Sequence, residues 1–167
     1  LVYSDTGDYA ANLEKATAKL SATQCPKPTQ TMQKVATPGI ATIAELTEAL
    51  DIPAAQQVKM LLFKGSESPA VALILRGDHK LNAIKAGQLD VLASPLEWLD
   101  NETVQREIGA QVGSLGPVGL TIPYVVDREA AALADFSCGA NETGYHYTGV
   151  NWERDVPLGP TADLRNV

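Results

Sequence analysis

Two short apolar segments in the middle of the chain constrain its fold more than any other feature of the sequence. The first is VKMLLFKG at residues 58–65, the second is PAVALILRGD at residues 69–78, and only SES lies between them. Because each segment is short, apolar and bounded by glycine or proline, both are typical of strands buried in a sheet. The short connection predicts that the two strands are neighbours joined as a hairpin.

Helices are predicted on both sides of this hairpin. Thr42 and Glu45 have the spacing of a capping box at the start of an amphipathic segment. A better helical segment spans residues 99–113, where Asp100 occupies the N-cap position. Weaker helical patterns occupy residues 81–89 and residues 1–21.

The rest of the chain predicts strands, and the mixture of elements sets the fold class. TIPYVVD at residues 121–127 is β-branched and apolar, while YHYTGVNW at residues 145–152 alternates. The alternation predicts one strand face that carries His146, Thr148, Val150 and Trp152. Since strands and helices do not alternate as βαβ units, we expect a single α+β domain in which helices surround a mixed, barrel-like sheet.

The length and charge of the chain limit its possible partners. Its 167 residues suit one compact domain, and its formal net charge is -7. Broad binding to a phosphate backbone depends on clustered lysines and arginines, so any contact with nucleic acid is expected to be local or assisted by another domain. No apolar stretch approaches the roughly 18 to 20 residues of a membrane span, and the N-terminus lacks the order of a signal peptide. We therefore expect a soluble, cytoplasmic protein.

The cysteines and histidines do not form a metal-binding pattern. Cys25 and Cys138 are far apart in sequence, and His79 and His146 add no ligand spacing. The usual catalytic motifs are absent as well, because there is no nucleophile elbow, no H-E-x-x-H and no P-loop. We predict no metal and no cofactor.

Four features remain as candidates for a site, and each has a structural alternative. Lys59 lies within the first apolar run, where its ammonium either reaches water from an edge strand or meets a phosphate or carboxylate in a pocket. His146 suits either a packed position or a pocket, and Asp127 either caps the next turn or serves a site. The stretch QVGSLGPVG at residues 111–119 is either a helix C-cap running into a turn or a pocket wall with accessible backbone amides.

Several segments together resemble one known family. In chain order they are YSDTGDYAAN, TIAELTEAL, VKMLLFK, RGDHKLN, VGSLGPVG, VVDR, GANETGYHYTGVNWERD and ADLRNV. This ordered set spans essentially the whole chain. It resembles the insertion (editing) domain of bacterial-type prolyl-tRNA synthetase, of the superfamily that includes free-standing trans-editing aminoacyl-tRNA deacylases.

The resemblance implies a reaction, partners and a division of the chain. The reaction is hydrolysis of the ester in mischarged Ala-tRNA(Pro), carried out by the cis-editing domain of a proline-tRNA ligase. This domain on its own could not charge tRNA. The partners are the acceptor end of that tRNA and the rest of the synthetase, which is expected to be a homodimer. The expected division is a flank and linker at residues 1–30, the editing domain at residues 31–156, and a returning flank at residues 157–167.

The resemblance also implies site residues, matched motif by motif. The catalytic positions are Lys59, Gly113, Gly116, Asp127 and His146. The substrate-binding positions are Thr37, Leu46, Lys59, Ser114, Leu115, Pro117 and His146. Met60 departs from the pattern, because many relatives have a small hydroxyl residue after the lysine.

The missing nucleophile is compatible with this reaction. An aminoacyl ester is already activated, so a positioned water, donors for the oxyanion and the ribose hydroxyl of the substrate could suffice. A synthetic pocket built for proline cannot firmly exclude alanine, because lost apolar contacts are worth only about 1 to 3 kcal/mol, whereas a smaller second pocket can exclude proline. Two other classes stay open: a structural insertion that has lost deacylation, and a module that only binds the tRNA end or an amino acid.

Overall fold

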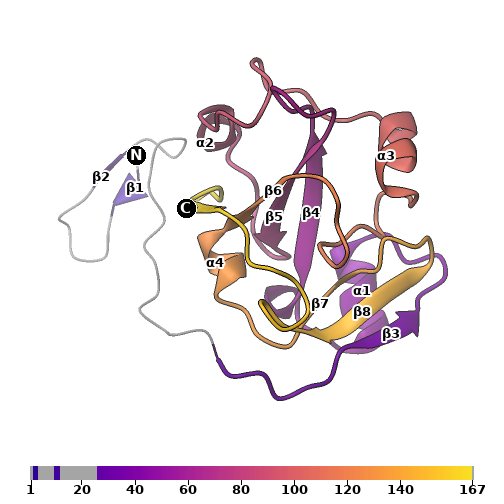
Figure 1. Cartoon of the computed structure of the whole chain (residues 1–167). Coiled ribbons are helices and arrows are strands. Elements are labelled where there is room, and N and C mark those ends of the chain that lie inside the picture. The colour runs from indigo at the N-terminus through magenta and orange to yellow at the C-terminus, as the bar shows by residue number, and fades with distance from the viewer. Residues whose placement is uncertain (1, 4–9, 12–25, 167) are drawn as a thin grey trace.

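The computed structural model describes residues 2–3, 10–11 and 26–166 of the chain (Figure 1). The strands β1 (Val2–Tyr3) and β2 (Ala10–Ala11) form an antiparallel pair. The rest of the helical pattern predicted for residues 1–21, and Cys25, lie outside the described residues. Within the described part, no helix has both the length and the apolar character needed to cross a membrane.

A four-stranded sheet forms the centre of the domain and confirms the predicted hairpin. Strands β4 (Val58–Phe63) and β5 (Val71–Arg76) are antiparallel neighbours. Strands β6 (Tyr124–Asp127) and β9 (Thr161–Ala162) continue the sheet in parallel, which gives the order β4-β5-β6-β9. β4 is therefore an edge strand.

Alternate side chains of β4 enter two different cores. Val58, Met60 and Leu62 belong to a core shared with the second sheet. Leu61 and Phe63 belong with the core on the opposite face, beneath the helix that follows β5. Since both faces of the sheet are covered, β4 is apolar at every position except Lys59 and does not alternate with polar residues.

The second sheet has three antiparallel strands in the order β3-β8-β7. They are β3 (Gln33–Ala36), β7 (Phe136–Gly139) and β8 (Tyr145–Val150). Together with the first sheet and the helices they confirm a single mixed α+β domain. The sheets do not close into the expected barrel: within residues 26–166 their edge strands are joined by one bridge, Gln57 with Ser137.

A bulge in the second sheet changes which side chains of β8 share a face. The register pairs Tyr147 with Cys138 and Val150 with Phe136, so β8 has one more residue than β7 in this interval. Because Phe136 and Cys138 lie on one face of β7, Tyr147 and Val150 lie on the same face of β8. The predicted face with His146 and Val150 together is therefore wrong, because alternation cannot anticipate an inserted residue.

Within residues 26–166, five short helical segments surround the sheets. They are α1 (Ile43–Leu50), η1 (Ala54–Gln56), α2 (Ala83–Gly87), α3 (Asn101–Ile108) and α4 (Arg128–Ala131). Thr42 Oγ1 accepts the Glu45 N–H at 3.1 Å, which confirms the capping box at the start of α1. The Asp100 carboxylate accepts the Thr103 N–H at 2.7 Å and confirms the predicted start of α3.

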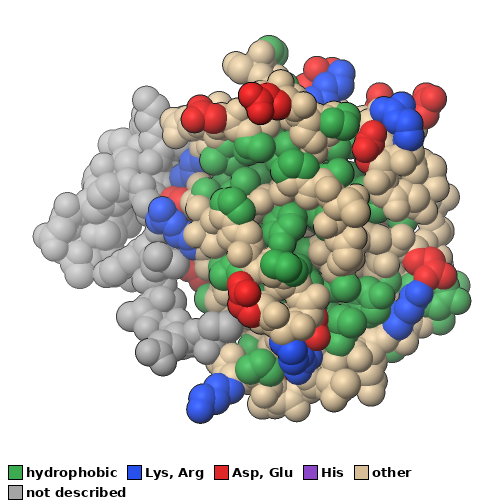
Figure 2. Space-filling view, viewed as in Figure 1, with side chains coloured by type: hydrophobic (Ala, Val, Ile, Leu, Met, Phe, Trp, Pro, Cys, Tyr) green, Lys and Arg blue, Asp and Glu red, His purple; other side chains and the backbone are tan. Residues whose placement is uncertain are grey.

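Positive charge on the surface is interspersed with negative charge. In Figure 2 charged side chains lie mostly around the periphery of the visible face, while hydrophobic side chains gather at its middle. Lys64 pairs with Glu97 at 3.0 Å and Arg76 pairs with Asp78 at 2.7 Å. Each of these two basic side chains is therefore matched by a neighbouring carboxylate.

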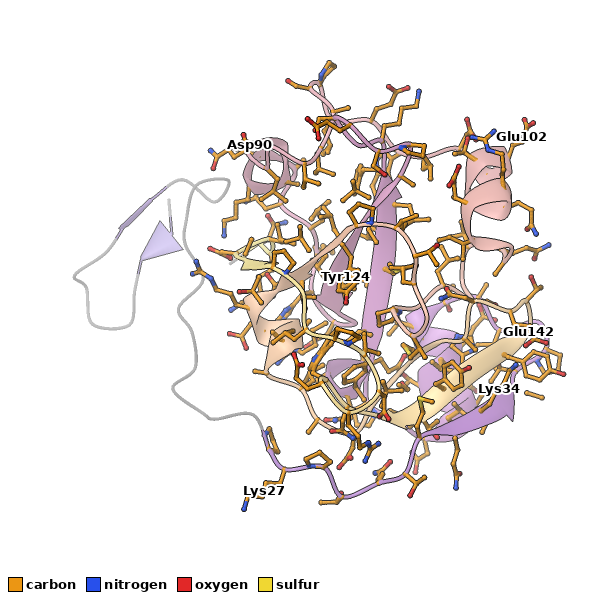
Figure 3. The ribbon with its side chains drawn as sticks, viewed as in Figure 1. Lys27, Lys34, Asp90, Glu102, Tyr124 and Glu142 are labelled. Atoms are coloured by element: carbon orange, nitrogen blue, oxygen red, sulfur yellow. The ribbon has the colours of Figure 1, made fainter. Side chains whose placement is uncertain are left out.

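Ion pairing also fixes β3 against its neighbour. Lys34 on β3 and Glu142, just before β8, point toward one another and form an ion pair (Figure 3). The Lys34 ammonium also lies 4.9 Å from the centre of the Tyr145 ring. These contacts hold β3 beside the start of β8.

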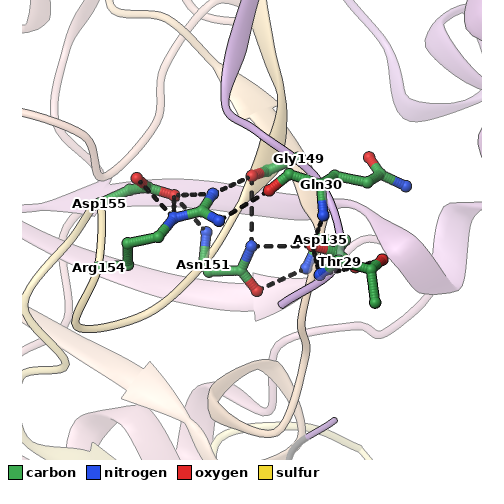
Figure 4. Close-up of polar contacts among 7 residues, drawn as sticks. All are labelled: Thr29, Gln30, Asp135, Gly149, Asn151, Arg154 and Asp155. Carbon is green, nitrogen blue, oxygen red and sulfur yellow. Dashed lines mark hydrogen bonds and ion pairs between the residues drawn. The ribbon is translucent and has the colours of Figure 1, made fainter. Parts of the chain in front are cut away.

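A polar network ties the chain before β3 to the end of β8 (Figure 4). The Asp135 carboxylate accepts the backbone N–H groups of Thr29 at 3.1 Å and Gln30 at 3.0 Å. It also accepts Asn151 Nδ2 at 2.9 Å, and Arg154 donates to the Gln30 carbonyl at 2.7 Å. Burial alone would raise the pKa of Asp135, but these hydrogen bonds outweigh burial and lower it to about 2.

Asp135→Asn is expected to lower the free energy of unfolding at pH 7 by about 1 kcal/mol, because asparagine keeps an acceptor but loses the charge, and solvent screens part of that charge. The pKa in the folded state lies below the ordinary value of 3.8, so the contribution is present above that value and is lost as the pH falls through about 2. Urea unfolding of both proteins between pH 2 and pH 7 measures the difference. A difference that does not change with pH would contradict this role of the carboxylate.

Candidate functional site

The candidate site is a cavity between the edge strands of the two sheets. Gln57 and Ser137 form the bridge that joins these strands, and the strands are unpaired beyond it in the described chain. A cavity of about 210 Å³ lies there, between residues 58–61 of β4 and residues 138–139 of β7. The start of α1 and the glycine-rich loop after α3 close its other sides.

The cavity is small and has mostly apolar walls. Its apolar side chains come from α1, β4, the loop and β7, and include Leu46, Val58, Met60, Leu115 and Cys138. Its volume is below the roughly 300 to 1,000 Å³ of pockets that hold drug-sized ligands. The cavity therefore suits a small group, such as the side chain of a small amino acid.

Lys59 is a half-buried residue of β4 that lines this cavity. Its Nζ donates to the Gly77 carbonyl at 3.4 Å, which is a long hydrogen bond that a better acceptor could replace. Burial lowers the pKa of the Lys59 ammonium, Asp78 opposes that shift, and Lys80 adds to it. The structure thus places the lysine on an edge strand and at a cavity together.

His146 reaches the same cavity from β8 and is 4 % exposed. Its Nδ1 lies 2.5 Å from Oγ1 of Thr37, a buried residue directly after β3. Burial lowers the pKa of His146, and a hydrogen bond with the Gly113 backbone opposes the shift. Since the ordinary value of 6.5 is already below neutrality, the ring is uncharged at pH 7.

Gly113 forms the part of the loop that lines the cavity. Its φ is 103°, a conformation that favours glycine, and a Cβ there would lie 2.8 Å from the Cα of Ala41. The loop follows α3, which ends at Gly109 in a left-handed C-cap. The stretch that begins at residue 111 is therefore both a turn after a helix and a wall of the cavity.

Two backbone amides of this loop are already used within the protein. The Ser114 N–H donates to the Gln111 carbonyl at 3.1 Å. The Gly116 N–H donates to Oδ1 of Asn141 at 2.8 Å, and Asn141 Nδ2 donates back to the Gly116 carbonyl at 2.7 Å. The accessible amides expected from composition are thus not those of Ser114 and Gly116, because the loop needs them to hold its own shape.

The loop and β7 cross in direct backbone contact. A Cβ on Gly139 would lie 2.3 Å from the carbonyl carbon of Ser114 and 2.4 Å from the backbone nitrogen of Leu115. A Cβ on Gly116 would lie 2.0 Å from the Gly139 carbonyl oxygen. Glycine is required at both positions because no side chain fits between the two backbones.

Asp127 does not line the cavity. Its buried carboxylate accepts the Glu129 N–H at 3.0 Å, which caps α4, and the Leu164 N–H at 2.8 Å. Leu164 is itself fully buried, and Lys85 pairs with Asp163 at 3.0 Å in the same segment. The contacts of Asp127 therefore join the end of β6 to the segment after β9.

The structure brings together about half of the residues matched by resemblance. Lys59, Leu46, Gly113, Leu115 and His146 line the cavity. The lining does not include Thr37, Ser114, Gly116, Pro117 or Asp127. Among these, Thr37 contacts His146. Ser114 and Gly116 contact Gly144 and Gly139 on the side of the loop away from the cavity lining. Their sequence neighbours Gly113 and Leu115 line the cavity.

Several lining residues were not singled out as site residues from the sequence. They are Ala41, Thr42, Ile43, Val58, Leu61, Val112, Cys138 and Gly139, whereas Met60, which also lines the cavity, had been noted as a departure beside the lysine. Their side chains follow ordinary apolar or capping patterns, which are typical of a core. Gly139 follows neither pattern. Its contact with Gly116 can be recognised only once the loop and β7 are known to cross.

Cys138 is not a nucleophile in the ground state of this site. Burial raises the pKa of its thiol well above the usual range, and Asp155 adds to the shift. No group of three or more His, Cys, Asp or Glu side chains in the described residues could hold a metal ion. The cavity is lined by Lys59, whose Nζ lies at the Gly77 carbonyl, and by an uncharged imidazole, main-chain groups and apolar side chains, a set that can bind and orient an ester.

Comparison with known proteins shows a family match over most of the chain. Residues 37–156 match the model of the family described as an aminoacyl-tRNA editing domain. Among solved structures, the chain is similar to a protein from a study of epitope backbone grafting onto scaffolds by computational design, with a TM-score of 0.68 and 22% identity over 81% of this chain and 87% of that one.

Two further solved structures share the fold. One is described as a candidate trans-editing enzyme for prolyl-tRNA synthetase, with a TM-score of 0.65 and 21% identity over 81% of this chain and 87% of that one. The other is a hypothetical protein, with a TM-score of 0.64 and 21% identity over 81% of this chain and 92% of that one. At these identities the similarity shows a common fold.

Gly139→Ala is expected to lower the free energy of unfolding by at least about 2 kcal/mol, because its Cβ would have to displace backbone rather than a flexible side chain. Gly87→Ala is the matched control: no atom lies within 4 Å of its Cβ position, so a change between zero and about 1 kcal/mol of added stability is expected. Urea unfolding of the three proteins measures both effects. Equal effects of the two substitutions would contradict the crossing.

Proposed function

Because the chain belongs to the aminoacyl-tRNA editing domain family, we propose that it is a deacylase that hydrolyses the ester of alanine mischarged to proline tRNA. The observation that carries this proposal is the convergence of Lys59, His146, Gly113 and Leu46 on one cavity of about 210 Å³. These residues come from four separate segments of the chain. Nothing in the packing of a core requires a lysine and a histidine to line one apolar cavity.

The walls support selection for a small side chain. Leu46, Met60 and Leu115 are buried residues that surround the space, so a larger amino acid would have to displace well-packed side chains. Rejection by such a clash can be strong, whereas a synthetic site for proline loses only about 1 to 3 kcal/mol of contacts when alanine enters it. This difference is the reason for editing alanine at a second site.

In the proposed reaction, water adds to the ester carbonyl carbon, and the bond from that carbon to the ribose oxygen then breaks. The products are free alanine and tRNA with a restored ribose hydroxyl. Lys59 binds the phosphate or ribose region of the terminal nucleotide, where an ammonium gains a charge-assisted contact in place of the long Gly77 bond. The vicinal ribose hydroxyl and main-chain donors assist the attack, since the cavity offers no thiolate.

Charge supports recognition of the single-stranded end rather than the duplex. The net charge of the chain is -7, and basic side chains such as Lys64 and Arg76 are paired with acids. We place the domain as a cis-editing insertion in a cytoplasmic, homodimeric prolyl-tRNA synthetase, whose other domains hold the rest of the tRNA. The order of the motifs supports this placement, with the editing domain at residues 31–156 between flanks at 1–30 and 157–167. In the proposed domain, Asp127 holds the segment at Leu164 in place and Thr37 holds His146 in place.

Lys59→Ala is expected to lower kcat/KM for Ala-tRNA(Pro) hydrolysis by about tenfold to a hundredfold, the value of one charge-assisted contact. Lys64→Ala is the matched control, since Lys64 follows β4 but pairs with Glu97 outside the cavity, and it should change the rate less than twofold. The assay follows release of labelled alanine, with the remaining synthetase domains supplied.

The alanine-release assay, combined with a measurement of binding to the tRNA acceptor end, separates deacylation from the two alternatives, a binding module and a structural insertion. A protein that binds the acceptor end without hydrolysis would be a binding module, and one that does neither would be a structural insertion.

His146→Ala tests the pocket wall, because its removal should reduce the discrimination between alanyl and prolyl esters. Unchanged discrimination would show that His146 does not limit the amino acid.

Cys138→Ala is expected to retain hydrolysis within about threefold of the native rate, because a protonated, buried thiol contributes volume and not nucleophilic attack. The measurement is a single-turnover rate together with a search for a covalent alanyl-protein by mass spectrometry. A loss of more than about a hundredfold, with the fold intact, would point to a thioester intermediate and overturn the water mechanism.

A further inference from the structure

A second pocket lies beside the cavity, between α3 and the start of the glycine-rich loop. Its volume is about 370 Å³, which falls in the range of roughly 300 to 1,000 Å³ for pockets that hold ligands of drug size. The described residues that line this α3 pocket are Asn101, Val104, Gln105, Ala110, Gln111 and Val112. Val112 also lines the first cavity, so the two spaces share a wall. No step of the proposed deacylation uses the α3 pocket.

The local fold brings three carboxamide side chains to the α3 pocket. Asn101 and Gln105 are four residues apart on α3, so they lie on one face of the helix. The helix then ends at Gly109 in a left-handed C-cap, and the chain turns so that Gln111 lines the same pocket. The backbone of Gln111 is fixed there, because its N–H donates to Thr143 Oγ1 at 3.3 Å. All three carboxamides belong to exposed residues and are open to a ligand.

The rest of the lining is apolar. Val104 and Ala110 are buried, whereas Val112 is 61 % exposed. An exposed aliphatic side chain at a pocket can pack against the flat face of a ligand and gain dispersion contacts. None of the six described residues that line the α3 pocket is charged. The lining therefore offers uncharged polar groups together with apolar surface, and it does not offer the cation that a phosphate would call for.

We propose that the α3 pocket binds the base of the terminal adenosine that carries the ester, so that the base and the amino acid lie in neighbouring spaces. This inference rests on the proposed deacylation, because it takes the ester to lie in the first cavity. A single ribose joins the base of that nucleotide to the ester, so the two must be bound close together. The wall shared at Val112 places the two spaces side by side.

Uncharged carboxamides suit the edge of a base. Each carries an N–H donor and a carbonyl acceptor side by side, and Asn or Gln pairs in this way with N6 and N7 of adenine. The bases of a duplex are stacked and paired, whereas a base in a single strand offers its face to Val112 and its edge to Gln105. Because α3 lies at the periphery of the domain (Figure 1), a single strand can reach the pocket from solvent.

Binding of an unacylated end tests the pocket without hydrolysis. The trinucleotide CpCpA is expected to shift the side-chain amide signals of Asn101, Gln105 and Gln111 in proton–nitrogen correlation spectra, and to bind about tenfold more tightly than CpCpU, the value of one bidentate base contact. Gln105→Ala should weaken CpCpA binding about tenfold and abolish the preference for adenine. Gln88→Ala is the matched control, since Gln88 is an exposed carboxamide at the end of α2 outside the pocket, and it should leave the Kd within twofold. Equal affinity for the two trinucleotides, or carboxamide signals that do not shift, would overturn the proposal.

Kinetics of hydrolysis give the second test. Gln105→Ala is expected to raise KM for Ala-tRNA(Pro) about tenfold with kcat changed less than twofold, because a base contact is equally strong in the ground state and the transition state. Val112→Glu should raise KM more than Val112→Ala, since it places a carboxylate beside the nucleotide at an exposed position that tolerates substitution. A lowered kcat with an unchanged KM in Gln105→Ala would overturn the proposal. A native protein that prefers CpCpA through these carboxamides but hydrolyses no ester would support the pocket and refute only the proposed deacylation.

Discussion

The whole site depends on one close contact, the crossing of the glycine loop over β7. Gly139 and Gly116 bring two backbones so near that a Cβ on Gly116 would lie 2.0 Å from the Gly139 carbonyl oxygen. This contact sets where the loop can run, and therefore where Gly113 meets Ala41 and the His146 ring. A looser crossing would leave the same residues in the sequence but no defined wall, since a cavity keeps its shape only when the backbone behind it cannot move.

A second buried contact holds the opposite wall. Gln57 has no exposed surface, and its Nε2 donates to Thr47 Oγ1 and to the Ile52 carbonyl, both at 2.8 Å. The same residue is bridged to Ser137 and accepts the Gly77 N–H at 2.7 Å. One side chain and its backbone thus connect α1, β4, β7 and the turn that carries the carbonyl partner of Lys59. Buried amides of this kind fix geometry, because each lost bond leaves a polar group without a partner.

What could be predicted from the sequence was mainly local. The capping box at Thr42 and the hairpin of β4 and β5 follow from neighbouring residues, and so does the N-cap at Asp100. The face of His146 could not be obtained this way, because the bulge opposite residues 136–138 shifts the alternation. The convergence on one cavity was reachable only by resemblance, since Lys59 and His146 are 87 positions apart in the chain. Resemblance in turn selected Asp127, whose contacts join β6 to Leu164 away from the cavity.

The failure of the sheets to close explains both the architecture and the chemistry. Had β4 and β7 continued to pair beyond Gln57 and Ser137, hydrogen bonds between them would have filled the space where the cavity lies. Instead the edge of β4 at Lys59 borders a gap, and Leu46, Leu115 and Cys138 form the walls of that gap. Edge strands usually risk pairing with other chains, and here the loop and α1 cover the gap at residues 58–61. An opened sheet edge therefore supplies a lysine, main-chain groups and an apolar space at one place, which is what recognition of an ester requires when no side chain attacks it.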